Sequence, residues 1–181
     1  MTDSKTISKD WLLPGAVCDA QSVTADWQPV AADLIDGVVV REAKTMARGT
    51  GALTELWRAD WGVDDEPVRQ VFQNTIEPGG YSAWHAHAVA IDRITVNLGQ
   101  LTMVLYDARQ TSPTFGRLNE FHLTAMRPTL VTIPPKVWHG VVNRTGVVAS
   151  LVNMPDVAYT YEAPDHWRVP ADSPDVPYRI V

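Results

Sequence analysis

Hydrophobic and polar residues alternate in short runs from Gly37 onward, and residues that favour turns separate these runs. The clearest run covers residues 92–98, where a strand would place Asp92 on the same face as Ile94 and Val96. Many short strands with little helical periodicity predict an all-β sandwich or barrel. The other expected strands are 37–41, 68–75, 101–106, 129–133, 137–143 and 147–153. Residues 51–57 are compatible with either a strand or a helical turn.

The chain divides into three parts around one expected barrel. Residues 1–36 carry scattered Trp, Pro and Gly, which predicts an N-terminal arm with short strands. The barrel is expected over residues 37–162, and the proline-rich residues 163–181 predict an irregular C-terminal tail on the surface. A chain of 181 residues is long enough for one well-packed domain.

Composition narrows the classes of partner. The net charge of -6 disfavours nucleic acid and anionic membranes, but it leaves a small anionic substrate open. No hydrophobic run reaches the roughly 20 residues that span a bilayer, and the first residues lack the apolar segment of a signal peptide. Cys18 is the only cysteine, so no intramolecular disulfide can form. We therefore expect a cytoplasmic protein that binds neither nucleic acid nor membranes.

Three histidines and one carboxylate form the candidate chemistry. His85, His87 and Asp92 lie in the pattern G-x5-H-x-H-x4-D-x6-G, and His139 follows in a later segment. On a strand, His85 and His87 would point to one face. Such donors suit a divalent transition metal such as Zn, Fe, Mn or Ni. The plainer alternative is a structural H-x-H pair, and Asp92 could instead orient a histidine or pair with the neighbouring Arg93.

These segments resemble the paired motifs of the cupin superfamily, G-x5-H-x-H-x3/4-E-x6-G and P-x-G-x2-H-x3-N. Asp92 stands where the first motif has Glu, and Lys136 stands where the second has Gly. Pro134, His139 and Asn143 match the second motif. The resemblance implies a double-stranded β-helix, which is a jelly-roll barrel, with a metal bound by His85, His87, Asp92 and His139.

A closer resemblance covers the chain from about Gly37 to the tail. Residues 107–117 are similar to the D-x-R-x-x-S-P-T-F-G segment of dTDP-4-dehydrorhamnose 3,5-epimerases, and residues 133–140 to their I-P-x-x-x-x-H-G. Residues 51–61 and 159–164 resemble two further segments of that family, R-G-x-F-x-E-x-F and Y-Y-x-P. The resemblance implies a keto-sugar substrate and a homodimer formed through the barrel and the arm.

Several functional positions of that family are replaced here. His85 falls on the histidine that removes the proton beside the ketone, but Val152 falls on the tyrosine that acts as general acid. Ser82 replaces a phosphate-binding arginine. The family's glutamine and lysine correspond to His87 and about Asp92, so two replacements produce the ligand pattern of metal cupins.

Two further residues are candidates for catalysis. Arg93 could substitute for the missing lysine or hold an anionic substrate, and Tyr106 could act as an acid. Their plainer interpretations are a structural ion pair for Arg93 and a core residue for Tyr106. His122 and His166 lie outside both motifs, and we expect them at the surface or in packing roles.

The leading hypothesis is a metal-dependent cupin enzyme of the sugar-epimerase-like branch. It would act on a small keto-sugar or related carbonyl compound by Lewis-acid-assisted isomerisation, epimerisation or elimination. One alternative is a metal-free sugar-nucleotide 3,5-epimerase, resembling the dTDP-4-dehydrorhamnose enzymes, with His85 as the base. The others are an iron cupin dioxygenase and a non-catalytic cupin that binds a metabolite.

Overall fold

The computed structural model describes residues 9–26 and 33–181. Its contacts divide the chain into two units, one that ends at Ala32 and one that comprises Asp33–Val181. Residues 9–26 form turns and irregular chain, and Cys18 is exposed. The remainder of the predicted arm within the first unit, residues 1–8 and 27–32, lies outside the described residues.

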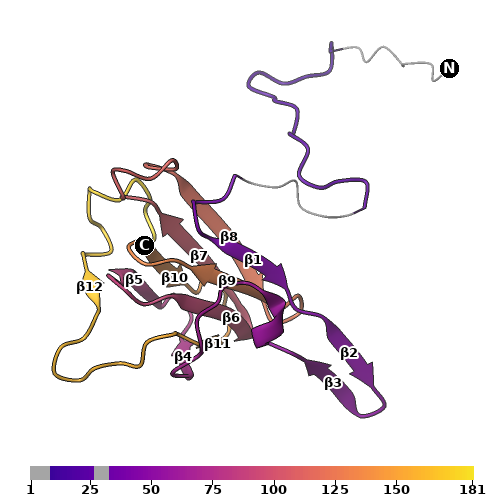
Figure 1. The fold of residues 1–181 in the computed structure, drawn as a ribbon. Helices are drawn as coiled ribbons and strands as arrows, with labels where there is room; N and C mark the ends of the chain where they lie inside the picture. Colours follow the sequence, from indigo (N-terminus) through magenta and orange to yellow (C-terminus); the bar gives the residue numbers. More distant parts are fainter. Residues whose placement is uncertain (1–8, 27–32) are drawn as a thin grey trace. The chain divides into compact units, whose positions relative to one another are not determined.

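The second unit is built from antiparallel strands, as the alternating pattern predicted (Figure 1). One five-stranded sheet has the order β1 (Val39–Glu42), β9 (Thr129–Ile133), β6 (Asp92–Leu98), β11 (Ala149–Asn153) and β4 (Phe72–Ile76). The other has the order β12 (Trp167–Arg168), β5 (Tyr81–Ala86), β10 (Trp138–Val142), β7 (Gln100–Tyr106) and β8 (Leu118–Thr124). A separate hairpin consists of β2 (Thr45–Arg48) and β3 (Gly51–Thr54).

Few parts of the unit are helical. Within the described residues, the one helical element is a 3₁₀ turn, η1 (Ala59–Trp61). The segment whose assignment the sequence left open therefore begins as strand β3. Among the described residues, no helix has the length and hydrophobicity that crossing a membrane requires.

The main hydrophobic core contains residues from both sheets. Ile94 and Val96 of β6 are buried in it, together with Leu151 of β11 and Met103 of β7. Asp92 is buried as well, as the alternation along β6 predicted. These hydrophobic side chains fill one part of the space between the sheets. Asp92, the first residue of β6, lies at the edge of that part.

The C-terminal tail is part of the folded unit. Val176 and Ile180 are buried in a second hydrophobic cluster with Trp84. Gly140 permits this packing, since a Cβ atom there would lie 2.5 Å from the Cβ of Ala83 and 2.9 Å from Cδ1 of Ile180. The expectation of a tail that merely runs over the surface is therefore wrong for its last residues.

A buried carboxylate organises the loop between β7 and β8. Asp107 is inaccessible to solvent and accepts hydrogen bonds from Arg109 Nε at 2.8 Å, Ser112 Oγ at 2.6 Å and Thr114 Oγ1 at 2.6 Å. Although burial opposes ionisation, these donors hold the pKa of Asp107 well below its usual range. Thr114 Oγ1 also accepts the backbone N–H of Asp36 at 2.9 Å, so the network joins the loop to the start of the unit.

The substitution Asp107→Asn should lower the free energy of unfolding by about 2 to 4 kcal/mol at pH 7, because it leaves buried donors without a charged partner. Since folding lowers the pKa of Asp107, its contribution is present above the unfolded pKa of about 4 and is lost as the pH falls. Urea denaturation at pH 7 and at about pH 3 measures both effects. Asp172→Asn, at an exposed position, is the control. A difference from wild type that is equal at both pH values would contradict the assignment.

Candidate functional site

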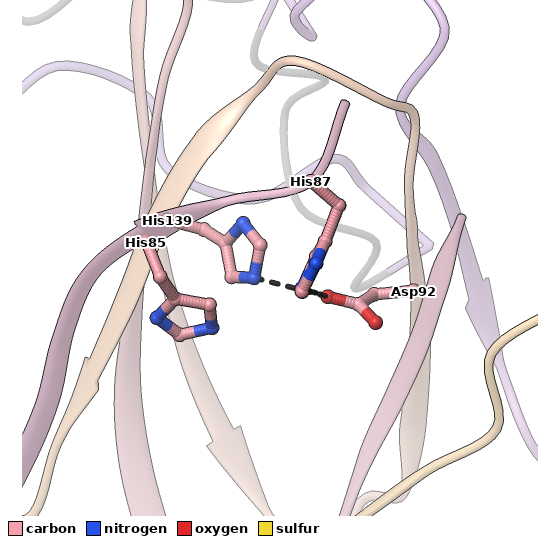
Figure 2. Close-up of side chains that lie close together, drawn as sticks. All are labelled: His85, His87, Asp92 and His139. Carbon is pink, nitrogen blue, oxygen red and sulfur yellow. Dashed lines mark ion pairs between the residues drawn. The ribbon is translucent and has the colours of Figure 1, made fainter. Parts of the chain in front are cut away.

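A cavity of about 570 Å³ opens between the two sheets. His85, His87, Asp92 and His139 line it together with residues of the segment that follows β11, including Tyr159 and His166. The four residues predicted as metal ligands are thus brought together at one place (Figure 2). Each offers one ligand atom, and these atoms lie within 4.8 Å of one another.

Three strands position these side chains. His85 lies on β5 opposite His139 of β10, where the two residues form a register pair, and Asp92 begins β6. His87 follows the end of β5, and its carbonyl oxygen accepts the N–H of Lys136 at 2.6 Å. Lys136 has a positive φ of 67°, the left-handed conformation that explains a glycine at this motif position. The turn before His139 is therefore present although its glycine is not.

Asp92 is the centre of the cluster. Its Oδ2 atom lies 3.0 Å from Nε2 of His139 and 3.2 Å from Nε2 of His87 (Figure 2). Its Oδ1 atom accepts a hydrogen bond of 2.7 Å from Nδ2 of Asn153. In spite of the short distances, the buried atoms Asp92 Oδ2 and His139 Nε2 make no well-directed hydrogen bond to any described residue.

In two of the imidazoles, the nitrogen that does not face Asp92 contacts a backbone carbonyl oxygen. Nδ1 of His139 lies 3.0 Å from the carbonyl oxygen of Val137, and Nδ1 of His87 contacts the carbonyl oxygen of Asp165. A carbonyl oxygen can only accept, so Nδ1 carries the proton in both rings. Nδ1 of His85, in contrast, is buried and has no hydrogen-bond partner among the described residues.

Burial and mutual contact set the charges in the site. Burial, reinforced by His139, lowers the pKa of His85 well below its usual value, so its imidazole is neutral at pH 7. Burial opposes ionisation of Asp92, but His139 and His87 hold its pKa well below the usual range. For His87, contact with Asp92 outweighs the effect of burial and raises the pKa. The site therefore contains a carboxylate anion beside a neutral imidazole.

Asp165 is a residue of the site that sequence reasoning missed. Its carboxylate accepts the backbone N–H groups of Ala88 at 2.7 Å, Val89 at 2.9 Å and Ala90 at 3.2 Å. It thereby holds the loop between His87 and Asp92, while its own carbonyl oxygen contacts His87. No local pattern identified it, because the partners lie more than 70 residues earlier in the chain.

His166 also belongs to the cavity, contrary to the expected surface or packing role. Its ring centroid lies 5.0 Å from those of both His85 and His87, and its Nε2 atom is buried with no hydrogen-bond partner among the described residues. Burial, with Arg168 nearby, lowers the pKa of His166 to about 4. His122, by comparison, lies on β8 with an exposed side chain 3.5 Å from Glu120, as expected.

Arg93 and Tyr106 do not join the histidines. Arg93 is fully buried on the other face of β6, where its Nε donates to Asp64 at 2.7 Å and its Nη1 to the Met154 carbonyl at 3.0 Å. Tyr106 packs against the hydrophobic cluster around Trp84. Neither residue lines the cavity. The structure thus gives both residues the plainer role, a structural ion pair for Arg93 and packing for Tyr106.

Strand β11 places no tyrosine in the cavity. Leu151 and Asn153 line it, whereas Val152 between them does not. Because neighbouring strand residues face opposite ways, the position compared with the family's acid tyrosine points away from the site. The two residues that do face the cavity carry no hydroxyl, so this strand supplies no acid.

The sequence matches known proteins over most of its length. The family model described as dTDP-4-dehydrorhamnose 3,5-epimerase matches residues 33–176. The probable low-salt glycan biosynthesis epimerase Agl13 of Haloferax volcanii is 33% identical over 139 residues, which are 76% of this chain and 89% of that protein. The spore coat polysaccharide biosynthesis protein SpsL of Bacillus subtilis is 29% identical over 77% of this chain and 91% of that protein.

Solved structures share the fold. The dTDP sugar isomerase of Desulfovibrio desulfuricans superimposes with a TM-score of 0.74 at 26% identity, over 80% of this chain and 90% of that one. The 3'-monoepimerase ChmJ of Streptomyces bikiniensis, in complex with dTDP-quinovose, superimposes with a TM-score of 0.71 at 24% identity, over 80% and 75% of the two chains. The predicted all-β jelly-roll barrel is confirmed.

The role of Asp165 can be tested through the loop that it holds. Asp165→Ala removes the acceptors of three amides, so hydrogen exchange at residues 88–90 should accelerate at least tenfold and stability should fall by about 1 to 3 kcal/mol. Hydrogen exchange followed by NMR or mass spectrometry measures the effect. Glu162→Ala, at an exposed position of the same segment, is the control. Unchanged exchange at residues 88–90 in Asp165→Ala would refute this role.

Proposed function

The chain belongs to the dTDP-4-dehydrorhamnose 3,5-epimerase family, and we propose that it inverts a carbon atom beside the carbonyl group of a keto-sugar nucleotide. Membership makes it an enzyme of the isomerase or epimerase type. The relatives support a sugar substrate, since one is a probable glycan biosynthesis epimerase and another takes part in polysaccharide biosynthesis. The complex of ChmJ with dTDP-quinovose supports a nucleotide-linked sugar.

The observation that carries the proposal is the place of His85. It corresponds by resemblance to the family's base, and it lines the cavity. A neutral imidazole can remove the proton from a carbon beside a carbonyl group. A proton from solvent water then reaches the opposite face of that carbon and gives the epimer, and the His85 imidazolium returns its proton to solvent.

A second group must stabilise the oxygen of the enolate that forms. Strand β11 supplies no tyrosine for this purpose, but His166 places a neutral imidazole in the cavity. The N–H of a neutral imidazole can donate a hydrogen bond to a carbonyl oxygen as negative charge develops there. We assign this role to His166, which lines the cavity with its ring centroid 5.0 Å from that of His85.

Proton exchange with solvent tests the function directly. In D₂O, the protein should introduce deuterium beside the carbonyl group of a dTDP-4-keto-6-deoxy sugar, as followed by NMR. His85→Asn should slow this exchange by about 10² to 10⁴-fold, because it removes the base. His122→Asn changes an exposed histidine and should leave the rate unchanged. Undiminished exchange in His85→Asn would exclude His85 as the base.

A metal-dependent form of the reaction is the second candidate. The convergence of His87 and His139 on the carboxylate of Asp92 favours it, because such donors can hold a Lewis acid near the substrate carbonyl. Dialysis against EDTA distinguishes the two forms. The metal-dependent form predicts loss of deuterium exchange, with recovery when Zn²⁺ or Mn²⁺ is added back. The metal-free form predicts exchange at the original rate.

A further inference from the structure

We infer that His87, Asp92 and His139 form a binding site for one divalent transition metal ion, and that His85 beside them is not a ligand. This narrows the four-residue set that the sequence suggested. The site itself is independent of the reaction catalysed, and only the use of His85 as a base rests on the proposed function.

The first argument is an inventory of protons. Because Nδ1 of His87 and of His139 each face a backbone carbonyl oxygen, the proton of each neutral ring lies on Nδ1. Their Nε2 atoms then carry lone pairs. Both lone pairs point at the same carboxylate oxygen of Asp92, at 3.2 and 3.0 Å. When both rings are neutral, three acceptors converge on one small volume, and a metal ion there can bind all three.

Two of the converging atoms, Asp92 Oδ2 and His139 Nε2, are buried without a hydrogen-bond partner among the described residues. Asp92 is 3% exposed and His139 is 2% exposed, so water cannot screen the repulsion between them. A proton on Nε2 of His87 would pair with Asp92 but would leave Nε2 of His139 without a partner in the described part of the chain. Moreover, an imidazolium would be expected to donate a straight hydrogen bond, whereas His139 Nε2 makes none to the described residues. A metal ion between the three atoms satisfies all of them at once.

The second argument is the support behind each donor. Histidine ligands of metals usually donate their other nitrogen to a carbonyl oxygen, which fixes the orientation of the ring. His87 and His139 both show this contact, and Oδ1 of Asp92 is held by Asn153 at 2.7 Å. Asp165, which contacts His87, is itself fixed by three backbone amides.

Among the described residues, His85 has neither a contact that fixes its outer ring nitrogen, Nδ1, nor a close contact with the carboxylate of Asp92. No carbonyl oxygen or carboxylate holds its Nδ1 atom, and no ion pair joins it to Asp92 among the described contacts. Two histidines and one carboxylate, with the remaining positions open, are the donor set of many catalytic metal sites. Zn²⁺, Fe²⁺, Mn²⁺ and Ni²⁺ suit these nitrogen and oxygen donors. When bound, such an ion would supply Lewis-acid stabilisation of a substrate oxygen, while His85 remains available to move a proton.

The test measures metal binding rather than activity. Untagged full-length protein is dialysed against EDTA, then titrated with Zn²⁺ by calorimetry, and its metal content is determined by mass spectrometry. We expect one ion per chain in wild type and in His85→Asn, with affinities within about threefold of each other. His87→Asn and Asp92→Asn should lose at least a hundredfold in affinity. His122→Asn is the matched control at an exposed histidine.

The alternatives give different results. No Zn²⁺ binding by wild type would overturn the site, and an equal loss in His85→Asn and His87→Asn would overturn the exclusion of His85. If a variant fails to fold, NMR of the imidazole nitrogens in the wild-type protein identifies which histidines bind the metal. Zn²⁺ should shift Nε2 of His87 and His139 but leave both nitrogens of His85 free of metal. Metal binding without deuterium exchange would refute the proposed reaction and leave the site intact.

Discussion

The buried negative charge of Asp92 is the constraint on which the site depends. A carboxylate that is removed from water must be balanced by partners, and here they come from different strands. Imidazoles arrive from the end of β5 and from β10, and the amide of Asn153 arrives from β11. Asn153 also accepts the backbone N–H of Arg93, so the same residue joins β11 to β6 at the floor of the cavity. The groups that stabilise the Asp92 carboxylate thus come from both sheets.

The segment after β11 supplies further residues of the site. Asp165 holds the loop between His87 and Asp92, and His166 lies in the cavity beside His85. This segment is held in place by β12, which pairs with β5, and by the burial of Ile180 close to Gly140. An irregular stretch of chain can therefore carry functional groups accurately, because the residues that follow it are anchored to β5 and β10.

Comparison with the family shows how a shared barrel accommodates a different set of polar groups. The loop network around Asp107 gives a structural role to the D-x-R segment that resembles the family's, and His85 stands at the position that the resemblance assigns to the base. Around it lie the imidazoles of His87 and His139 and the carboxylate of Asp92, and at two of these positions the resemblance places other side chains in the family. Arg93 follows Asp92 directly in the chain, yet it is bound to Asp64 on the opposite face of β6. Alternation along one strand therefore separates a structural ion pair from the site by a single residue.

The sequence alone determined the β architecture, the shared face of Asp92 with Ile94 and Val96, and the meeting of His85, His87, Asp92 and His139. The β architecture and the shared face of Asp92 follow from alternation within about ten residues, whereas the meeting of His139 with the other three residues was inferred from the resemblance to the paired cupin motifs. Only the tertiary structure decided the roles of Asp165 and His166, the outward face of Val152, and the burial of Arg93 and Ile180. Their partners lie far away in the chain, such as Ala88 for Asp165 at a separation of 77 residues. No periodicity records such a contact, because it arises only when the sheets pack and the tail closes over them.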